Sequence, residues 1–251
     1  MDHGFFNWMM KIRKFAPFSK KELTWIGASI LIMAFIVGFD DGSGSFNTAT
    51  YLSNMGISLV AVAIAVIVHE MAHRIAAPNL GYKIEFKPFF FGIIGGLILT
   101  FMTYGKVIFL AYGSFYLDIM EKHRLGYFRH YLGYFDNGKV ALAGPLANLV
   151  AAMVFKSMVF LPEALVSKLV FVNVLFAITN MLPIPPLDGA HVLWSTKTLY
   201  PFIMASVIGA AALLLIPSVV WWVAILGALA IGIAWTMFYV NIVEGKLFGS
   251  F

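Results

Sequence analysis

The chain has 251 residues, of which 61% are hydrophobic and only 12% are charged. This composition excludes an ordinary soluble globular domain and indicates an all-α polytopic membrane protein, with residues 1–251 forming a single domain. Cysteine is absent, which excludes disulfides and thiolate metal sites. The net charge of +5 needs no nucleic-acid partner, because a basic surface beside the anionic lipids of a bilayer accounts for it.

The apolar stretches predict about six transmembrane helices, because each crossing of a bilayer needs roughly twenty apolar residues. In chain order, they lie at about 23–39, 57–77, 140–161, 165–182, 200–217 and 219–240. The last two come from one long apolar run. We divide that run at Pro217, because proline ends a helix and a tight turn can form there.

Basic residues determine the expected orientation of these spans. Lys11, Arg13 and Lys14 precede the first span, with no small-residue cleavage site behind it. Such clusters stay in the cytoplasm. Alternation then places residues 40–54 outside and residues 78–139 inside. The sequence therefore predicts a multi-pass cell-membrane protein whose N- and C-termini are both cytoplasmic.

Residues 78–139 are predicted to form a non-spanning segment on the cytoplasmic side, because they carry an excess of lysine and arginine, Lys106 among them. Within this segment, residues 89–103 are apolar enough to resemble a span. Their three glycines, the preceding proline and the alternating residues 82–87 instead favour strands and turns. We therefore expect a small membrane-associated β-hairpin or sheet after the second span.

The most specific signal in the chain is His69-Glu70-Met71-Ala72-His73, at the end of the apolar run 57–68. On a helix, residues four apart share a face, so both imidazoles can bind one zinc ion while Glu70 reaches the metal-bound water. The motif can also arise by chance. An ionisable group inside a membrane helix costs roughly 2.5–3.5 kcal/mol, however, so such groups usually face a cavity or a partner. The location of the motif therefore favours a metal site.

A zinc ion with two histidine ligands needs a third protein ligand, and Asp188 is the candidate. Asp188 follows three prolines at the end of the fourth span, near the same cytoplasmic level as the histidines. Broken helices at membrane depth usually line a functional cavity. A proline-rich Asp-Gly segment can also mark a simple loop turn, but together with the two histidines it favours a metal site nearer the cytoplasmic side.

Other polar residues near these motifs offer alternatives. Glu85, Asp118 and Glu121 are rival third ligands, although surface or interfacial charge is the simpler interpretation. His191 would be a fourth ligand only at the expense of the position that water needs. We expect Arg74, directly after the second histidine, to extend to the cytoplasmic interface. The remaining histidines of the loop, His123 and His130, are expected to be solvated or interfacial.

Three segments, taken together, resemble the site-2 protease family of intramembrane zinc proteases. They are HEMAH at 69–73, GPLAN at 144–148 and NMLPIPPLDG at 180–189, and they occur in the family's order over about residues 57–195. The resemblance makes the spans at 57–77, 140–161 and 165–182 the core helices and the other three peripheral. It implies that the metal is one zinc ion per chain.

The resemblance also implies roles for single residues. His69, His73 and Asp188 would bind zinc, and Glu70 would act as general base and later as proton donor. Asn180 matches the position that stabilises the oxyanion, and Asn148 matches an asparagine that positions substrate or packs the helices. The sequence departs from the family at Ala190, where a second glycine is common, which bears only on the exact turn after the aspartate.

The predicted function is an intramembrane zinc metalloprotease that hydrolyses a peptide bond within or near a transmembrane segment of a membrane-protein substrate. Such a segment must unwind locally before its carbonyl is accessible, and it could then pair with strand edges within residues 82–115. The alternative is a transporter or ion pathway that uses the buried histidine, glutamate and aspartate residues. A catalytically inactive family member that binds membrane partners is a third possibility.

Overall fold

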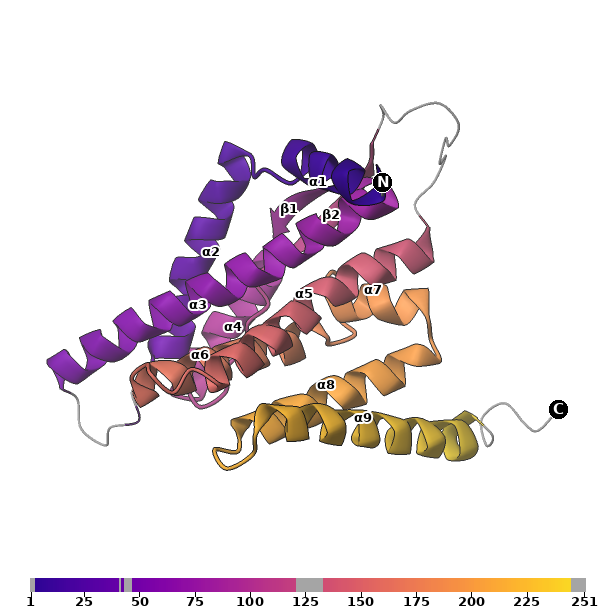
Figure 1. The fold of residues 1–251 in the computed structure, drawn as a ribbon. Coiled ribbons are helices and arrows are strands. Elements are labelled where there is room, and N and C mark those ends of the chain that lie inside the picture. The colour runs from indigo at the N-terminus through magenta and orange to yellow at the C-terminus, as the bar shows by residue number, and fades with distance from the viewer. Residues whose placement is uncertain (1–2, 41, 43–46, 121–132, 245–251) are drawn as a thin grey trace.

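A computed structural model describes residues 3–40, 42, 47–120 and 133–244 of the chain (Figure 1). Over these residues the protein is mostly helical and contains a small antiparallel sheet of two strands. The predicted fold class, a helical protein with a small sheet element after the early helices, is therefore confirmed.

Five helices in the described part of the chain are long and apolar enough to cross a membrane. They are α2 (Lys20–Gly38), α3 (Thr48–Ala76), α5 (Tyr134–Lys156), α6 (Glu163–Asn180) and α9 (Trp221–Phe238). The remaining predicted span corresponds to α8 (Leu199–Leu215), which is shorter, with 17 residues. The division of the last apolar run at Pro217 is confirmed, because this proline lies in the turn between α8 and α9.

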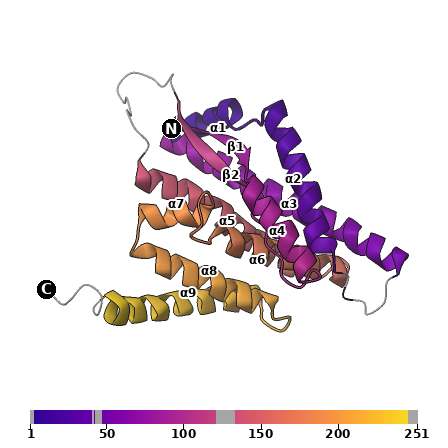
Figure 2. The ribbon, with the colours of Figure 1, turned by 180° about the vertical axis from the view of Figure 1, so that it is seen from behind.

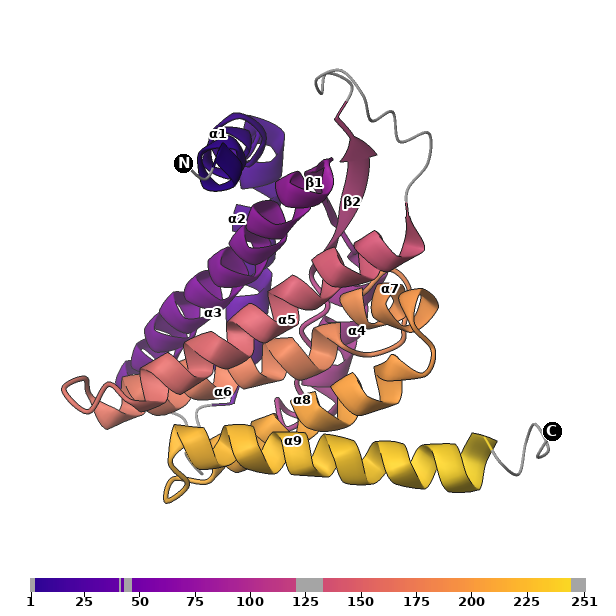
Figure 3. The same cartoon turned by 45° about the vertical axis from the view of Figure 1, so that its right-hand side comes forward.

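The centre of the molecule is formed by α3, α5 and α6, which pack on one another (Figures 1 and 3). On one side, α2 packs along α3. On the other, α8 and α9 form a hairpin that packs through α8 on α6 and α5. The shorter helices are α1 (His3–Phe15), the 3-10 turn η1 (Ala77–Leu80), α4 (Phe90–Met102), α7 (Asp188–Ser195) and the π-helical turn η2 (Tyr239–Glu244).

The small sheet consists of β1 (Tyr82–Pro88) and β2 (Gly113–Ile119), with Ile84 opposite Leu117. The alternation of residues 82–87 thus identified a real strand, and its buried and exposed residues alternate as expected. Our preference for strands and turns over residues 89–103 is wrong, because this stretch forms helix α4.

The glycines of α4 have a packing role rather than a turn role. Gly92 and Gly96 lie one turn apart on the same helix face, against the backbone of the chain that returns from α4 to β2. A Cβ atom added at Gly96 would lie only 2.6 Å from the Phe109 carbonyl oxygen. Glycine therefore lets an extended segment pack directly on the helix, and a sequence pattern alone does not distinguish this from a glycine-rich turn.

Helix α4 runs alongside α2 and reaches the C-terminal end of that helix (Figure 2). Trp25 contacts Phe90 near the start, and Phe39 contacts Phe101 near the end. A Cβ atom at Gly105 would lie 2.8 Å from Cβ of Asp40. The sequence analysis expected Asp40 outside the membrane and Gly105 inside. The contact between these two residues conflicts with that pair of expectations. Counting charges in a loop does not detect a segment that enters the helical layer and returns.

Candidate metal centre

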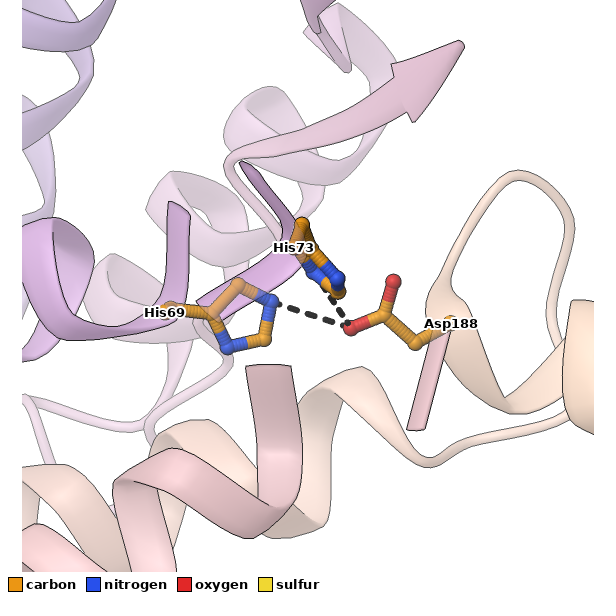
Figure 4. Close-up of side chains that lie close together, drawn as sticks. All are labelled: His69, His73 and Asp188. Atoms are coloured by element: carbon orange, nitrogen blue, oxygen red, sulfur yellow. Dashed lines mark ion pairs between the residues drawn. The ribbon is translucent and has the colours of Figure 1, made fainter. Parts of the chain in front are cut away.

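Three side chains predicted to bind metal meet between α3 and α7 (Figure 4). His69 and His73 lie one turn apart on α3, and Asp188 is the first residue of α7. The Asp188 Oδ2 atom is 2.9 Å from His69 Nε2 and 3.5 Å from His73 Nε2. All three residues are at most 3% exposed. The structure therefore brings together residues separated by more than one hundred positions in the sequence.

The outer nitrogen of each histidine is held by a hydrogen-bond acceptor. His69 Nδ1 lies 2.7 Å from the side-chain oxygen of Asn148, and His73 Nδ1 lies 2.7 Å from the Val140 carbonyl oxygen. The orientation of the Asn148 amide is defined, because its nitrogen donates to the Ala65 carbonyl oxygen at 3.0 Å. Both Nδ1 atoms therefore carry a hydrogen, and in the neutral imidazoles each Nε2 atom has a lone pair directed at Asp188.

This arrangement fits one metal ion. Oδ2 of Asp188 is buried and faces the two Nε2 atoms at 2.9 and 3.5 Å. These three groups could hold a metal ion between them, and two histidines with one carboxylate form a zinc ligand set that leaves a position open for water. Space is provided by Gly144 on α5, where a Cβ atom would lie 2.5 Å from His73 Nε2 and 2.7 Å from His69 Nε2.

Glu70 lies beside this cluster and is 2% exposed. Its Oε1 atom accepts a hydrogen bond of 2.8 Å from the hydroxyl group of Tyr112, whereas its Oε2 atom has no partner. Burial and the neighbouring Glu70 carboxylate raise the pKa of the Tyr112 phenol well above its ordinary value, so that the phenol stays protonated and donates. One carboxylate oxygen is thus held in place and the other is free to accept a proton.

Tyr112 is a residue that the sequence analysis missed. It lies on the extended segment between α4 and β2, where its ring packs on Phe86 and Phe176. The residue gives no signal in the sequence, because a tyrosine in an apolar stretch is usually a core residue. Only the return of this segment along α4 brings its hydroxyl group to the glutamate of α3.

The break between α6 and α7 positions Asp188. The backbone of Gly189 packs so closely on the Met181 and Leu182 carbonyl groups that no Cβ atom fits. From α8, the Tyr200 hydroxyl group donates to the Met181 carbonyl oxygen at 2.8 Å. Ala190, the departure from the family pattern, is a buried residue of α7, so its methyl group is accommodated without moving the aspartate.

The two asparagines selected from the sequence have different surroundings. Asn148 uses its oxygen for His69 and its nitrogen for Ala65 and Asn173, so that it joins α3, α5 and α6. These contacts correspond to helix packing and histidine orientation, one of the two roles expected for Asn148. Asn180 is the last residue of α6 and donates to the Phe176 carbonyl oxygen at 3.0 Å, which uses one of its two amide hydrogens.

Among the described residues, the rival ligands Asp118 and Glu85 do not join the cluster. Asp118 is exposed and pairs with Lys83 at 2.8 Å, and Glu85 is exposed on β1. His191 lies one turn beyond Asp188, where its Nδ1 atom accepts from the Asn137 amide at 3.1 Å. The third rival, Glu121, and the loop histidines His123 and His130 fall outside the described residues.

The expectation that Arg74 extends to the cytoplasmic interface is wrong, because this residue is only 1% exposed. Its guanidinium group forms an ion pair with Glu22 of α2 and donates to the Ile84 carbonyl oxygen of β1 at 3.3 Å. Glu22 in turn accepts from the backbone nitrogen of Phe86 at 2.8 Å. The pair therefore occupies one edge of β1. A partner 52 residues earlier in the chain is not evident from the sequence around Arg74.

Fold and site together define a helical protein whose long helices are able to span a membrane. It contains a buried candidate centre for one metal ion. Beside this centre lies Glu70, which has one carboxylate oxygen without a partner. No protein-family model matches the chain, and no solved structure matches it.

The chain is 36% identical over 197 residues to a protein of Methanocaldococcus jannaschii named "Putative zinc metalloprotease". The matched region covers 76% of this chain and 90% of the archaeal protein. The chain therefore belongs to the same family as that archaeal protein.

Proposed function

We propose that the protein is an intramembrane zinc metalloprotease of the site-2 protease type, which hydrolyses a peptide bond within or near a transmembrane segment of another membrane protein. The observation that carries this proposal is the buried cluster of His69, His73 and Asp188 with Glu70 beside it. The two histidines and Glu70 belong to α3, a helix long and apolar enough to cross a membrane. The family relation to a named zinc metalloprotease supports the same chemistry.

The two histidines and the aspartate would hold the zinc ion, which when bound polarises a carbonyl group and lowers the pKa of water towards about 7. The free Oε2 atom of Glu70 accepts the proton of the attacking water and later donates it to the leaving amine. Tyr112 keeps the other carboxylate oxygen in place during both steps. Asn180 has one amide hydrogen left with which to stabilise the developing oxyanion.

The substrate would be an extended, locally unwound segment that adds to the two-stranded sheet. Because Arg74 and Glu22 occupy the outer edge of β1, the edge of β2 that faces away from β1 is the favoured place for an added strand. β2 is close to the candidate centre: the ring of Phe115 packs on His73, and Ser114 donates to the Pro186 carbonyl oxygen at 2.6 Å. The protein would be a multi-pass membrane protein with both termini in the cytoplasm and the site nearer that side.

The first experiment measures zinc per chain in the purified protein and in the variants His73→Ala and Asp188→Ala, with Glu85→Ala as a matched control. We expect about one zinc per wild-type chain, its loss in the two ligand variants and its retention in the control. Cleavage of membrane-embedded substrates by the zinc-loaded protein in vesicles, abolished by a chelator, then tests the proteolytic activity. Absence of zinc from the wild type would contradict the proposal, and ion or proton flux without cleavage would favour a transporter.

A further inference from the structure

Helix α1 lies across the end of the molecule at which α2 begins and α3 ends (Figures 1 and 3). It is amphipathic, and Trp8 and Ile12 lie on the side that packs on the protein. Four large apolar side chains of α1 are exposed: Phe5 is 57% exposed, Phe6 71%, Met9 46% and Met10 66%. The outer apolar face of α1 is thus left without a partner within the protein.

The rotation of α1 about its axis is set by contacts with α3 and η1. The indole nitrogen of Trp8 donates to the Ile75 carbonyl oxygen at 3.2 Å. Ile75 belongs to the last turn of α3, whose final carbonyl groups have no partner within the helix. The bond therefore joins α1 to the helix end that lies two residues beyond His73, and it keeps the apolar face turned away from the protein.

The charge of this region has one sign. Residues 3–21 contain five lysines and arginines, at positions 11, 13, 14, 20 and 21, and no acidic residue. The next carboxylate along the chain, Glu22, is buried in its ion pair with Arg74 and does not neutralise them. Arg13 and Lys14 are exposed and follow the apolar face along the helix by one turn.

We propose that the outer face of α1 docks on anionic phospholipid. The apolar side chains enter the boundary between headgroups and acyl chains, and Arg13 and Lys14 meet the lipid phosphates. This arrangement is the one expected for an amphipathic helix rich in basic residues that lies in the plane of a membrane surface. Lipid is the occupant with matching chemistry, because α1 lies at the ends of helices able to span a bilayer, which is the level of the headgroups if these helices cross it.

The absence of cysteine makes a direct test possible in the full-length protein. A single cysteine at Phe6, on the apolar face, or at Asn7, the adjacent polar residue, carries a fluorophore. Each labelled protein is placed in vesicles of one composition, phosphatidylcholine with phosphatidylglycerol. In one preparation the neutral lipid carries bromine on its acyl chains, and in the other the anionic lipid does, so that quenching reports which lipid surrounds the label.

At Phe6→Cys we expect strong quenching, greater for brominated anionic lipid by roughly twofold or more, because each basic residue near the headgroups favours anionic lipid. When Arg13→Gln and Lys14→Gln are added to Phe6→Cys, the preference of the label for brominated anionic lipid should disappear. At Asn7→Cys the label should be quenched much less by either lipid. Equal quenching by the two lipids at Phe6→Cys would overturn the anionic preference. Absence of quenching there would show that solvent or another protein covers this face and would overturn the proposal entirely.

Discussion

Helix α3 of the centre and helix α9 of the hairpin formed with α8 reach the same mean hydropathy, yet the two regions are held together in different ways. In the centre, Asn148 and Asn173 form hydrogen bonds between three helices and orient a candidate metal ligand. In the hairpin, small residues allow close contact, as where Gly209 of α8 faces Ile231 of α9. Hydropathy therefore locates both regions but does not distinguish a helix that carries chemistry from a helix that covers it.

The largest expected effect is that of Glu70→Gln in the centre. The change keeps the size of the side chain and removes the group that accepts the proton, so activity should fall by about 10²–10⁴-fold while zinc content stays at the wild-type level. Substrate cleavage and zinc content are measured together. Glu163→Gln, at the exposed start of α6, serves as control. Wild-type cleavage by Glu70→Gln would exclude Glu70 as the general base.

Two glycine substitutions separate the centre from the hairpin. Gly144→Ala places a methyl group where the two Nε2 atoms converge, so we expect loss of zinc. Gly232→Ala places a methyl group against Ser206 across the hairpin and should lower the free energy of unfolding by about 1–3 kcal/mol without loss of zinc. Zinc content and thermal unfolding are measured for both variants, because the first should lose zinc and the second should lose stability. A zinc-loaded Gly144→Ala variant would show that the metal does not lie between these nitrogens.

Asn148→Ala tests whether hydrogen bonds around the ligands support metal binding. His69 would lose the acceptor that orients its ring, and the zinc affinity should fall by about 10–100-fold. Asn54→Ala is the matched control, since that amide joins α2 and α3 at their other end through the Gly38 carbonyl oxygen. Competition with a chelator of known affinity measures both variants. Equal affinities would mean that helix packing alone positions His69.

The smallest effect is expected for Tyr112→Phe, which removes a single hydroxyl group. Glu70 would keep its charge but lose its donor, and we expect kcat to fall by about tenfold with little change in KM or in zinc content. Tyr104→Phe, at an exposed residue after α4, should leave all three unchanged. A rise in KM at constant kcat would instead indicate that Tyr112 acts in substrate binding.

Much of the fold follows from patterns that are local in the sequence. Apolar stretches of the length of a bilayer predicted the long helices, and alternation at residues 82–87 predicted β1. The interpretation failed at α4, where glycines that pack against a returning chain were taken for turns. It failed again at Arg74, because its partner Glu22 belongs to a distant helix.

The sequence by itself determined that the chain is suited to a membrane, that His69 and His73 share a helix face, and that a helix breaks before Asp188. Each of these depends on spacing along the chain, which helix geometry converts directly into position. Only the tertiary structure decided which groups meet across helices. The acceptor for His69, the donor to Glu70 and the occupied edge of β1 depend on how separate elements pack, and no pattern within one segment records that packing.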